Sequence, residues 1–179
     1  MNFSADYAEH MQEIAELVST TFTASEDPTE GALIGDLALK LMSDTPQQDL
    51  FVFLAREGGA LVAVIFFSRL VYDGDARNVF VMGPVAVATL RQRQGIGQEL
   101  ITYGLDALRR QGVDVAITYG DTNFYWRVGF EPVSERDIPA PFALQHPEGW
   151  LGQPLTQVEL KPFTGPVRCV SAFRNPAFW

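Results

Sequence analysis

Apolar residues recur at two different spacings along the chain, and the change of spacing separates helices from strands. In residues 7–22 and again in residues 33–41 they lie three or four positions apart, which predicts two amphipathic helices. Residues 50–56, 60–72 and 79–87 are instead nearly continuous apolar runs rich in Val and Phe, separated by glycine-containing turns. Such runs are typical of the strands of an antiparallel meander.

The helical spacing returns after Gly97 and continues to Leu108, and a continuous apolar run follows at residues 113–118. A strand, a helix and a second strand in this order predict a crossover between parallel strands. We therefore expect residues 113–118 to pair in parallel with residues 79–87. Residues 121–128 predict a short helix, after which Phe130 opens a further strand.

Pro84 interrupts the apolar run at residues 79–87. A proline has no N–H group and cannot donate a hydrogen bond to a sheet ladder. We therefore expect a bulge at Pro84, where the strand bends away from its neighbour.

The density of prolines changes near Glu131. Eight of the 11 prolines follow this residue, so we expect residues 134–179 to be mostly loop, with candidate strands at 156–161 and 167–172. A segment with so many breakers is not expected to fold alone. The 179 residues are enough to bury one core. We expect a single domain over residues 1–179, with its core at about residues 1–133.

Composition narrows the class of protein and its compartment. A hydrophobic content of 47% and a charged content of 20% are ordinary for a globular protein. The longest apolar runs are far shorter than the roughly 20 residues of a membrane helix, and the N-terminus lacks a signal-peptide pattern. Cys169 is the single cysteine, so no internal disulfide forms, and we expect a buried, inert thiol in a cytoplasmic protein. The net charge of −9 argues against a nucleic-acid partner and permits an amine substrate.

A polar, glycine-punctuated turn at residues 91–97 joins the strand to the following helix. The first turn of a helix has free N–H groups, and glycines let an anion approach the backbone closely. Arg91 and Arg93 add positive charge. The same features suit a tight structural connection with solvated arginines. A dinucleotide fingerprint is excluded because Leu100 stands at its third glycine, and a P-loop because the turn has no lysine.

Two motifs in this region resemble a known family. Gln92-Arg93-Gln94-Gly95-Ile96-Gly97 resembles the Q/R-x-x-G-x-G/A signature of the GNAT acetyltransferase superfamily, and residues 123–130 resemble its FYxxxGF element. Their order and separation are similar to the YhbS-like subgroup, although Thr122 stands where that subgroup often has proline. The resemblance implies an α/β GNAT acyl-CoA N-acyltransferase fold. This fold has a mixed, mostly antiparallel sheet with helices on both faces and a splayed-strand cofactor cleft.

The resemblance also implies acetyl-CoA as co-substrate, without a metal. In the family, the backbone at the end of the preceding strand hydrogen-bonds the pantetheine arm, and the glycine turn holds the pyrophosphate. Carried onto this sequence, the pantetheine residues are Val85, Ala86 and Val87. The pyrophosphate residues are Gln92, Arg93, Gln94, Gly95, Ile96, Gly97 and Gln98.

Tyr125 corresponds to the family's usual general acid. A phenol has an ordinary pKa of about 10 and a thiol of about 8.5, so Tyr125 keeps its proton at neutral pH and can donate it to a thiolate. The alternative is that Tyr125 belongs only to an aromatic cluster with Phe124 and Trp126. Tyr119 and Tyr103 are further candidates for the acid.

The acceptor side is less defined. Glu26, Asp27 and Glu30 lie between the first two helices, where the family places substrate-facing residues, and they equally suit an acidic, solvated loop. No residue is assigned as the general base, because His10 and His146 lack any metal-ligand or triad pattern.

The expected reaction is transfer of an acetyl group from acetyl-CoA to an amine, small or peptide-borne, by direct attack in a ternary complex. The alternative is a non-catalytic sensor of CoA or acyl-CoA, which would not need Tyr125. We expect a monomer or a homodimer. The aromatic residues near the C-terminus either cover the sheet of the same chain or join a dimer; they are Phe173, Phe178 and Trp179.

Overall fold

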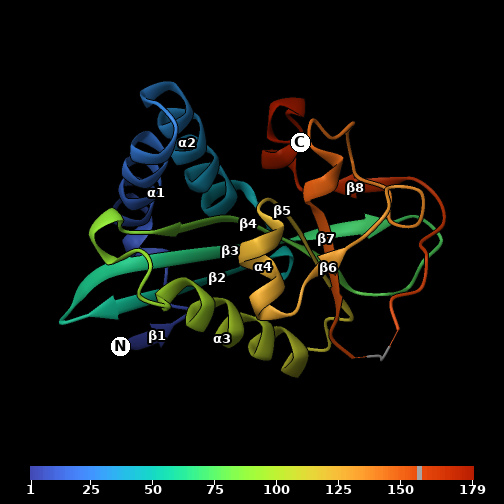
Figure 1. The fold of residues 1–179 in the computed structure, drawn as a ribbon, viewed down its shortest axis with the longest axis horizontal. Coiled ribbons are helices and arrows are strands. Elements are labelled where there is room, and N and C mark those ends of the chain that lie inside the picture. The colour runs from blue at the N-terminus through green and yellow to red at the C-terminus, as the bar shows by residue number, and fades with distance from the viewer. Residues whose placement is uncertain (157–158) are drawn as a thin grey trace. The chain divides into compact units, whose positions relative to one another are not determined.

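Helices and strands follow one another largely in the order that the apolar spacing predicts (Figure 1). The computed structural model describes residues 1–156 and 159–179. The main helices are α1 (Met11–Ser25), α2 (Pro28–Asp44), α3 (Ile96–Arg110) and the short α4 (Thr122–Tyr125). The strands are β1 (Asn2–Ser4), β2 (Leu50–Glu57), β3 (Ala60–Tyr72), β4 (Val79–Val87), β5 (Val115–Tyr119), β6 (Glu131–Pro132), β7 (Trp150–Pro154) and β8 (Val167–Cys169).

The described strands hydrogen-bond in the order β1-β2-β3-β4-β5-β7-β6, and β8 pairs with β3. The pairs β1/β2, β3/β8, β5/β7 and β6/β7 are antiparallel. The pair β4/β5 is parallel, as expected for strands joined by the crossover helix α3. The prediction of a mixed, mostly antiparallel sheet is therefore confirmed.

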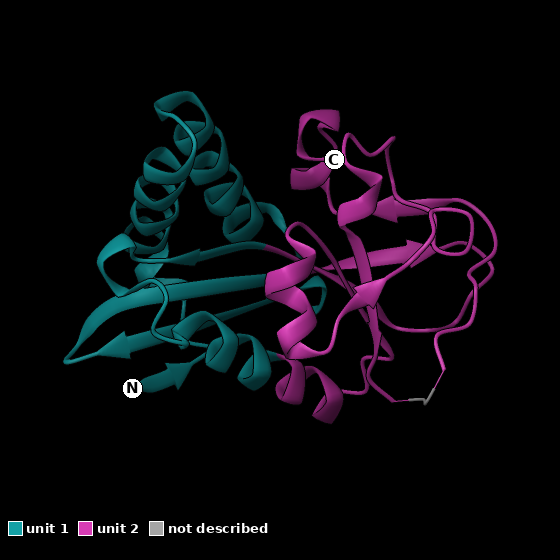
Figure 2. Cartoon of the chain, viewed as in Figure 1, with its two compact units in different colours: residues 1–67, 84–104 teal, residues 68–83, 105–179 magenta. Residues whose placement is uncertain are grey.

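The chain divides into two compact units (Figure 2). Unit 1 contains residues 1–67 and 84–104, and unit 2 contains residues 68–83 and 105–179. In unit 1, α1 and α2 lie on one side of the strands and the first part of α3 lies on the other (Figure 2). This arrangement places both predicted motifs at the ends of strands, the glycine turn in unit 1 and the aromatic motif in unit 2.

The helical pair in unit 1 packs closely because glycines line its contact. A Cβ atom on Gly31 would lie 1.9 Å from Thr23 Oγ1, and one on Gly35 would lie 2.9 Å from Ser19 Cβ. On the other side of the strands, a Cβ on Gly104 would lie 2.8 Å from the Ile65 side chain, so α3 sits directly on β3. Small residues thus allow close packing that larger side chains would prevent.

Unit 2 differs from the prediction after Pro132. The expected strand at 156–161 is wrong for Thr156 and residues 159–161, which are not in a strand, while residues 157–158 lie outside the described residues. A strand that was not predicted, β7, precedes it and pairs on both sides with β5 and β6. Trp150 and Leu151 are its fully buried residues. The expected strand at 167–172 ends at Cys169 and continues as a 3-10 turn.

The aromatic residues near the C-terminus pack inside unit 2. Trp179 is 2% exposed, and its Nε1 donates to the Phe173 carbonyl at 3.0 Å. Its ring also contacts Trp150 with 6.0 Å between centroids. Of the two expected roles, the structure contains the intramolecular one. The nearby Cys169 is buried, and burial raises the pKa of its thiol, in agreement with an inert cysteine.

Candidate active site

The turn between β4 and α3 has the backbone of an anion-binding site. Arg93 has φ 61° and Gly95 has φ 84°, so two left-handed residues flank Gln94. A left-handed conformation is uncommon for a residue with a side chain, and it persists only where the surrounding structure enforces it. Alternation of left-handed and other residues turns successive N–H groups toward one concavity, which suits a phosphate.

Two glutamine side chains brace this turn. Gln92 Nε2 donates to the Val87 carbonyl at 3.0 Å, and Gln94 Nε2 donates to the Leu90 carbonyl at 3.3 Å. Both amide groups are therefore used within the turn. The Gln92 main-chain N–H is used as well, because it donates to the Thr89 carbonyl at 3.4 Å. Gln94 can contribute to a phosphate site through its main-chain N–H, while both glutamine side chains fix the shape of the loop.

The start of α3 adds further N–H groups. The first backbone hydrogen bond of the helix within the described residues runs from Glu99 N–H to the Gly95 carbonyl at 3.0 Å. The N–H groups of Ile96, Gly97 and Gln98 therefore precede the helical ladder. Ile96 is 5% exposed and anchors this turn in the core. The concave backbone and the helix start together fit a diphosphate group, which needs several converging donors.

The two arginines of the turn differ in their partners. Arg91 forms an ion pair with Glu57, at the tip of the β2–β3 hairpin. Arg93 is exposed. A guanidinium that is already paired with a carboxylate is less able to bind a phosphate, so Arg93 is the better candidate for direct contact.

The end of β4 presents its backbone in the manner expected for a ligand-binding edge. Ala88 N–H donates to the Val62 carbonyl on β3 at 2.8 Å, so strand alternation directs the backbone groups of Val87 and Val85 away from β3. In unit 2, the parallel pairing of β4 with β5 ends with the Met82–Thr118 pair. Gly83 follows with φ 156°, and Pro84 has no N–H to donate.

Unit 2 holds Tyr125 at the C-terminus of α4. Asp121 caps this helix by accepting the Asn123 N–H at 2.9 Å. The Tyr125 ring makes T-shaped contacts with Phe124 and Phe130, with 5.0 and 6.0 Å between centroids. The ring is thus held by its neighbours. The cluster expected from the sequence is wrong for Trp126, which is 62% exposed, and Phe130 takes its place beside Tyr125.

The environment of Tyr125 keeps its hydroxyl protonated. Burial raises the pKa of Tyr125 to about 12; a hydrogen bond with Thr118 lowers it, and the Asp121 carboxylate raises it. Thr118 is fully buried and donates to the Met82 carbonyl at 3.1 Å. Its hydroxyl is thus fixed in place beside the phenol. Tyr125 therefore keeps a transferable proton throughout the neutral range.

The two other candidate tyrosines have structural partners. Tyr103 packs between Phe3 and Phe53 in unit 1, at centroid distances of 5.2 and 5.7 Å. Tyr119 accepts the His146 N–H at 2.7 Å and packs against Trp150. Neither is held in the way that Tyr125 is held beside Thr118.

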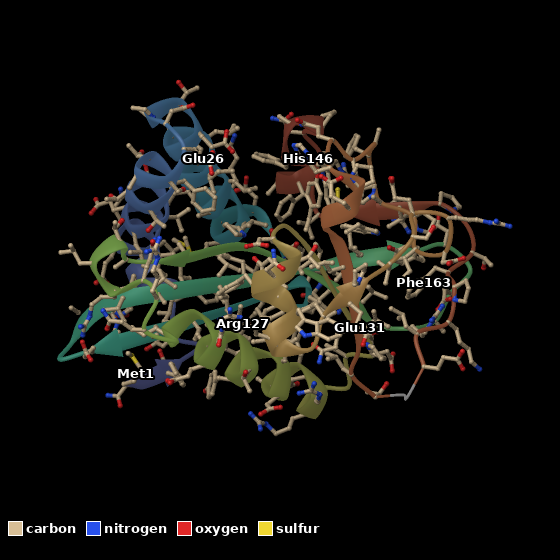
Figure 3. All side chains as sticks on the ribbon, in the orientation of Figure 1. Met1, Glu26, Arg127, Glu131, His146 and Phe163 are labelled. Carbon is tan, nitrogen blue, oxygen red and sulfur yellow. The ribbon has the colours of Figure 1, made fainter. Side chains whose placement is uncertain are left out.

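The acidic residues between α1 and α2 have different roles. Asp27 caps α2, because its Oδ1 accepts the N–H groups of Thr29 at 2.7 Å and Glu30 at 2.9 Å. Glu30 lies in the first turn of α2, where the helix dipole favours an acid. Glu26, labelled in Figure 3, follows the end of α1 and is exposed. The carboxylate of Asp27 thus has a structural role.

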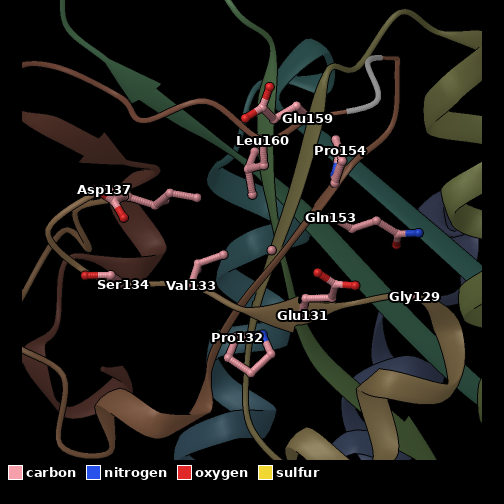
Figure 4. Close-up of a pocket in the computed structure, with 12 residues that line it drawn as sticks. Gly129, Glu131, Pro132, Val133, Ser134, Asp137, Gln153, Pro154, Glu159 and Leu160 are labelled. Atoms are coloured by element: carbon pink, nitrogen blue, oxygen red, sulfur yellow. The ribbon is translucent and has the colours of Figure 1, made fainter.

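A pocket of about 650 Å³ lies elsewhere in unit 2 (Figure 4). Its acidic lining residues are Glu131, Asp137 and Glu159. None of the residues predicted for the cofactor or the acid lines it. Within residues 1–156 and 159–179, no group of three or more His, Cys, Asp or Glu side chains is arranged to hold a metal ion. No helix in that part of the chain is long and apolar enough to cross a membrane.

Sequence reasoning missed the supports of Tyr125. Gly120 and Gly149 bring two backbone segments together, and the Gly120 N–H donates to the Gly149 carbonyl at 3.0 Å. The Gly-Asp pair before the short helix is visible in the sequence. Its partner near residue 149 is far away in the chain, and no local pattern connects the two.

Comparison with known proteins defines the class of this one. The chain matches the acetyltransferase (GNAT) domain family over residues 6–133. It is 32% identical over 139 residues to the uncharacterized N-acetyltransferase YjhQ of Escherichia coli (strain K12), covering 75% of this chain and 76% of YjhQ. It is 30% identical over 107 residues to the uncharacterized N-acetyltransferase YhbS of the same strain, covering 58% of this chain and 64% of YhbS.

Solved structures share the fold. The YhbS structure from Escherichia coli in complex with CoA has a TM-score of 0.69 at 24% identity, covering 90% of this chain and 87% of that chain. A GNAT family acetyltransferase from Brucella melitensis in complex with acetyl-CoA has a TM-score of 0.65 at 24% identity, covering 96% and 97%. The chain belongs to the GNAT acetyltransferase family. The predicted fold and enzyme class, an acyl-CoA-dependent acetyltransferase, are confirmed.

Proposed function

We propose that this protein transfers an acetyl group from acetyl-CoA to a primary amine, by direct attack of the amine in a ternary complex. The observation that carries the proposal is the left-handed pair Arg93 and Gly95, inside the motif that the family uses for the pyrophosphate. Neighbouring structures with CoA and acetyl-CoA support the choice of co-substrate.

The cofactor side uses mainly backbone groups. The N–H groups of residues 93–98 hold the pyrophosphate, with Arg93 adding charge and Gln92 bracing the loop. The backbone of Val85 and Val87, which is directed away from β3, hydrogen-bonds the pantetheine arm, and Ala86 between them faces β3. Acetyl-CoA, when bound, supplies an activated acyl group as a thioester. Holding both substrates side by side removes much of the entropic barrier to their reaction.

Tyr125 is the general acid in this proposal. Its raised pKa keeps the phenol protonated at neutral pH, and the fixed ring directs that proton to one place. A thiolate that leaves in a site shielded from water needs such a donor. A sensor of acyl-CoA would not require it, so the held and protonated phenol favours the enzyme.

The class of acceptor is proposed from the charge of the protein alone. A net charge of −9 favours a cationic or neutral amine, and the exposed Glu26 and the half-buried Glu30 are candidates to attract it. A single acetyltransferase domain over residues 1–179, a cytoplasmic location and a monomeric or homodimeric state complete the proposal.

The decisive experiment combines binding with turnover. Acetyl-CoA binding is measured by calorimetry, and a panel of diamines, aminoglycosides and peptides is screened for release of free thiol. Binding together with amine-dependent thiol release is the expected result. Binding without release for any amine would favour the sensor, and no binding would reject both functions.

A further inference from the structure

A second segment is fastened to the stretch of chain that presents Tyr125. The His146 N–H donates to Tyr119 Oη at 2.7 Å, and the Gly120 N–H donates to the Gly149 carbonyl at 3.0 Å. Thr122 Oγ1 also donates to the Glu148 carbonyl at 3.4 Å. The turn at residues 146–149 therefore lies directly against residues 119–122, from which α4 and Tyr125 begin.

This turn presents an imidazole together with its own carboxylate. His146 Nδ1 lies 3.3 Å from Glu148 Oε1, and the two side chains are 75% and 76% exposed. When Nδ1–H donates to the carboxylate, the lone pair of the neutral ring is on Nε2. The pair thus orients a basic nitrogen toward solution, where an amine arrives. His146 lies well away from Glu131 of the pocket (Figure 3).

The other titratable groups of this stretch are already engaged. The Tyr119 hydroxyl accepts the His146 N–H, and the Asp121 carboxylate accepts the Asn123 N–H. Tyr125 holds its proton because of burial. Asp121 is exposed as well, but its Oδ1 caps α4, whereas His146 and Glu148 form an exposed pair on the facing turn. Of these two, the neutral imidazole has a free nitrogen lone pair for the amine proton, while the Glu148 carboxylate orients the ring.

Acid and base must lie close together in this reaction. The attacking nitrogen bonds to the same carbon from which the sulfur departs, so the atoms that lose and gain protons are separated by two bonds. A base is therefore expected on a segment packed against the one that carries the acid. The turn at residues 146–149 meets this requirement within unit 2.

We propose that His146 is the general base and that Glu148 is its positioning residue; this rests on the acetyl transfer proposed above. His146 Nε2 takes one proton from the acceptor ammonium and releases it to water. The free amine forms the N–C bond as the C–S bond breaks, and the sulfur takes the Tyr125 proton. The second proton lost by the nitrogen returns to the Tyr125 oxygen, so amide, CoA thiol and one released proton are the products.

The test compares His146→Gln with His10→Gln. His10 is the matched control, because its Nδ1 also lies near a carboxylate, 3.5 Å from Glu13 Oε2, but in unit 1. For His146→Gln, kcat should fall on the order of 10²-fold with an unchanged KM for acetyl-CoA. His10→Gln should keep the rate of the wild type.

Further variants distinguish the base from the carboxylate that positions it. Glu148→Gln should lower kcat, since the imidazole loses the carboxylate that orients it, and Glu148→Asp should recover part of the rate. His146→Ala should be rescued by added imidazole, because the site is open to solution. Tyr125→Phe should not be rescued in this way.

The variants are expected to fold, since the His146 side chain is largely exposed and the bond to Tyr119 uses the backbone N–H. Circular dichroism checks this directly. A folded His146→Gln protein with the rate of the wild type would overturn the assignment of His146 as the general base, and would leave the proposed function intact. A wild type that binds acetyl-CoA but acetylates no amine would overturn the proposed function and the base with it.

Discussion

Gly120 lies directly against the ring of Tyr125, so close that a Cβ atom at position 120 would be 3.0 Å from Tyr125 Cε2. Gly120 also has φ 158°, which a residue with a side chain rarely adopts. Gly120 therefore affects the position of the phenol in two ways. Its missing side chain leaves room for the ring, and its backbone conformation is one that other residues rarely adopt.

Gly120→Ala should displace the Tyr125 ring and lower kcat, with a loss of stability on the order of 1–3 kcal/mol from the strained backbone. Gly74→Ala is the control, because Gly74 has φ 88° but a Cβ atom added there would meet no atom within 4 Å. Gly74→Ala should lose stability without losing rate. Equal kcat values in the two variants would show that contact with the ring does not matter. Thermal unfolding and steady-state kinetics measure the two effects.

Tyr125→Phe should keep the ring contacts with Phe124 and Phe130 and remove the proton. Turnover should fall on the order of 10²-fold or more, while stability and acetyl-CoA affinity change little. Tyr103→Phe removes a hydroxyl from a core tyrosine of unit 1 and should leave turnover unchanged. A rate near that of the wild type in Tyr125→Phe would leave Tyr125 as a packing residue only.

The raised pKa of Tyr125 predicts a loss of stability in alkali. The unfolded chain ionises its phenols near pH 10, whereas folded Tyr125 holds its proton up to about pH 12. The unfolded state therefore binds fewer protons in this interval, and the free energy of unfolding falls as the pH rises through it. The buried hydroxyl of Tyr72, which donates to the Pro139 carbonyl at 2.8 Å, acts in the same direction because burial raises its pKa as well.

Denaturant unfolding at pH 8 to 11 measures this slope. Tyr125→Phe and Tyr72→Phe should each make the decline shallower. An unchanged slope in both variants would contradict the assignment of the buried phenols.

The left-handed backbone at Arg93 predicts that two substitutions there differ in stability but weaken acetyl-CoA binding equally. Arg93→Gly should be more stable than Arg93→Ala by on the order of 1 kcal/mol, because glycine adopts a positive φ without cost. Both variants lose the guanidinium and should weaken acetyl-CoA binding to a similar extent, with a smaller dependence on salt than the wild type has. Calorimetry at two salt concentrations and thermal unfolding provide the data. Equal stability of the two variants would argue against a strained turn.

Local patterns predicted the helices, the meander and the crossover because each depends on neighbours in the sequence. The spacing of apolar residues identified α3, and the long run at residues 60–72 coincides with β3. The first helix was placed too early, since Ala8–His10 is a 3-10 turn and α1 begins at Met11. The second was placed too late, because Asp27 and Pro28 form its cap and first position.

Features that depend on distant residues were not predictable in this way. β7 is a strand because β5 and β6 flank it, although the surrounding prolines and Gly152 indicated a loop.

The candidate site also depends on residues that are distant in the sequence. The motif at residues 92–97 identified the turn, but the left-handed Arg93, the bracing by Gln92 and the packing of Gly120 under Tyr125 require the folded chain.

The end of β4 has a consequence for how freely the sequence can diverge. Backbone N–H and C=O groups are the same in nearly all amino acids, so a ligand held by Val85 and Val87 through the backbone places little demand on their side chains. Many apolar residues would serve at these two positions. Proline is the exception, because it removes the N–H itself. Evolutionary change at this edge of the strand should therefore be limited by packing in the core and by the avoidance of proline, with acetyl-CoA recognition preserved throughout.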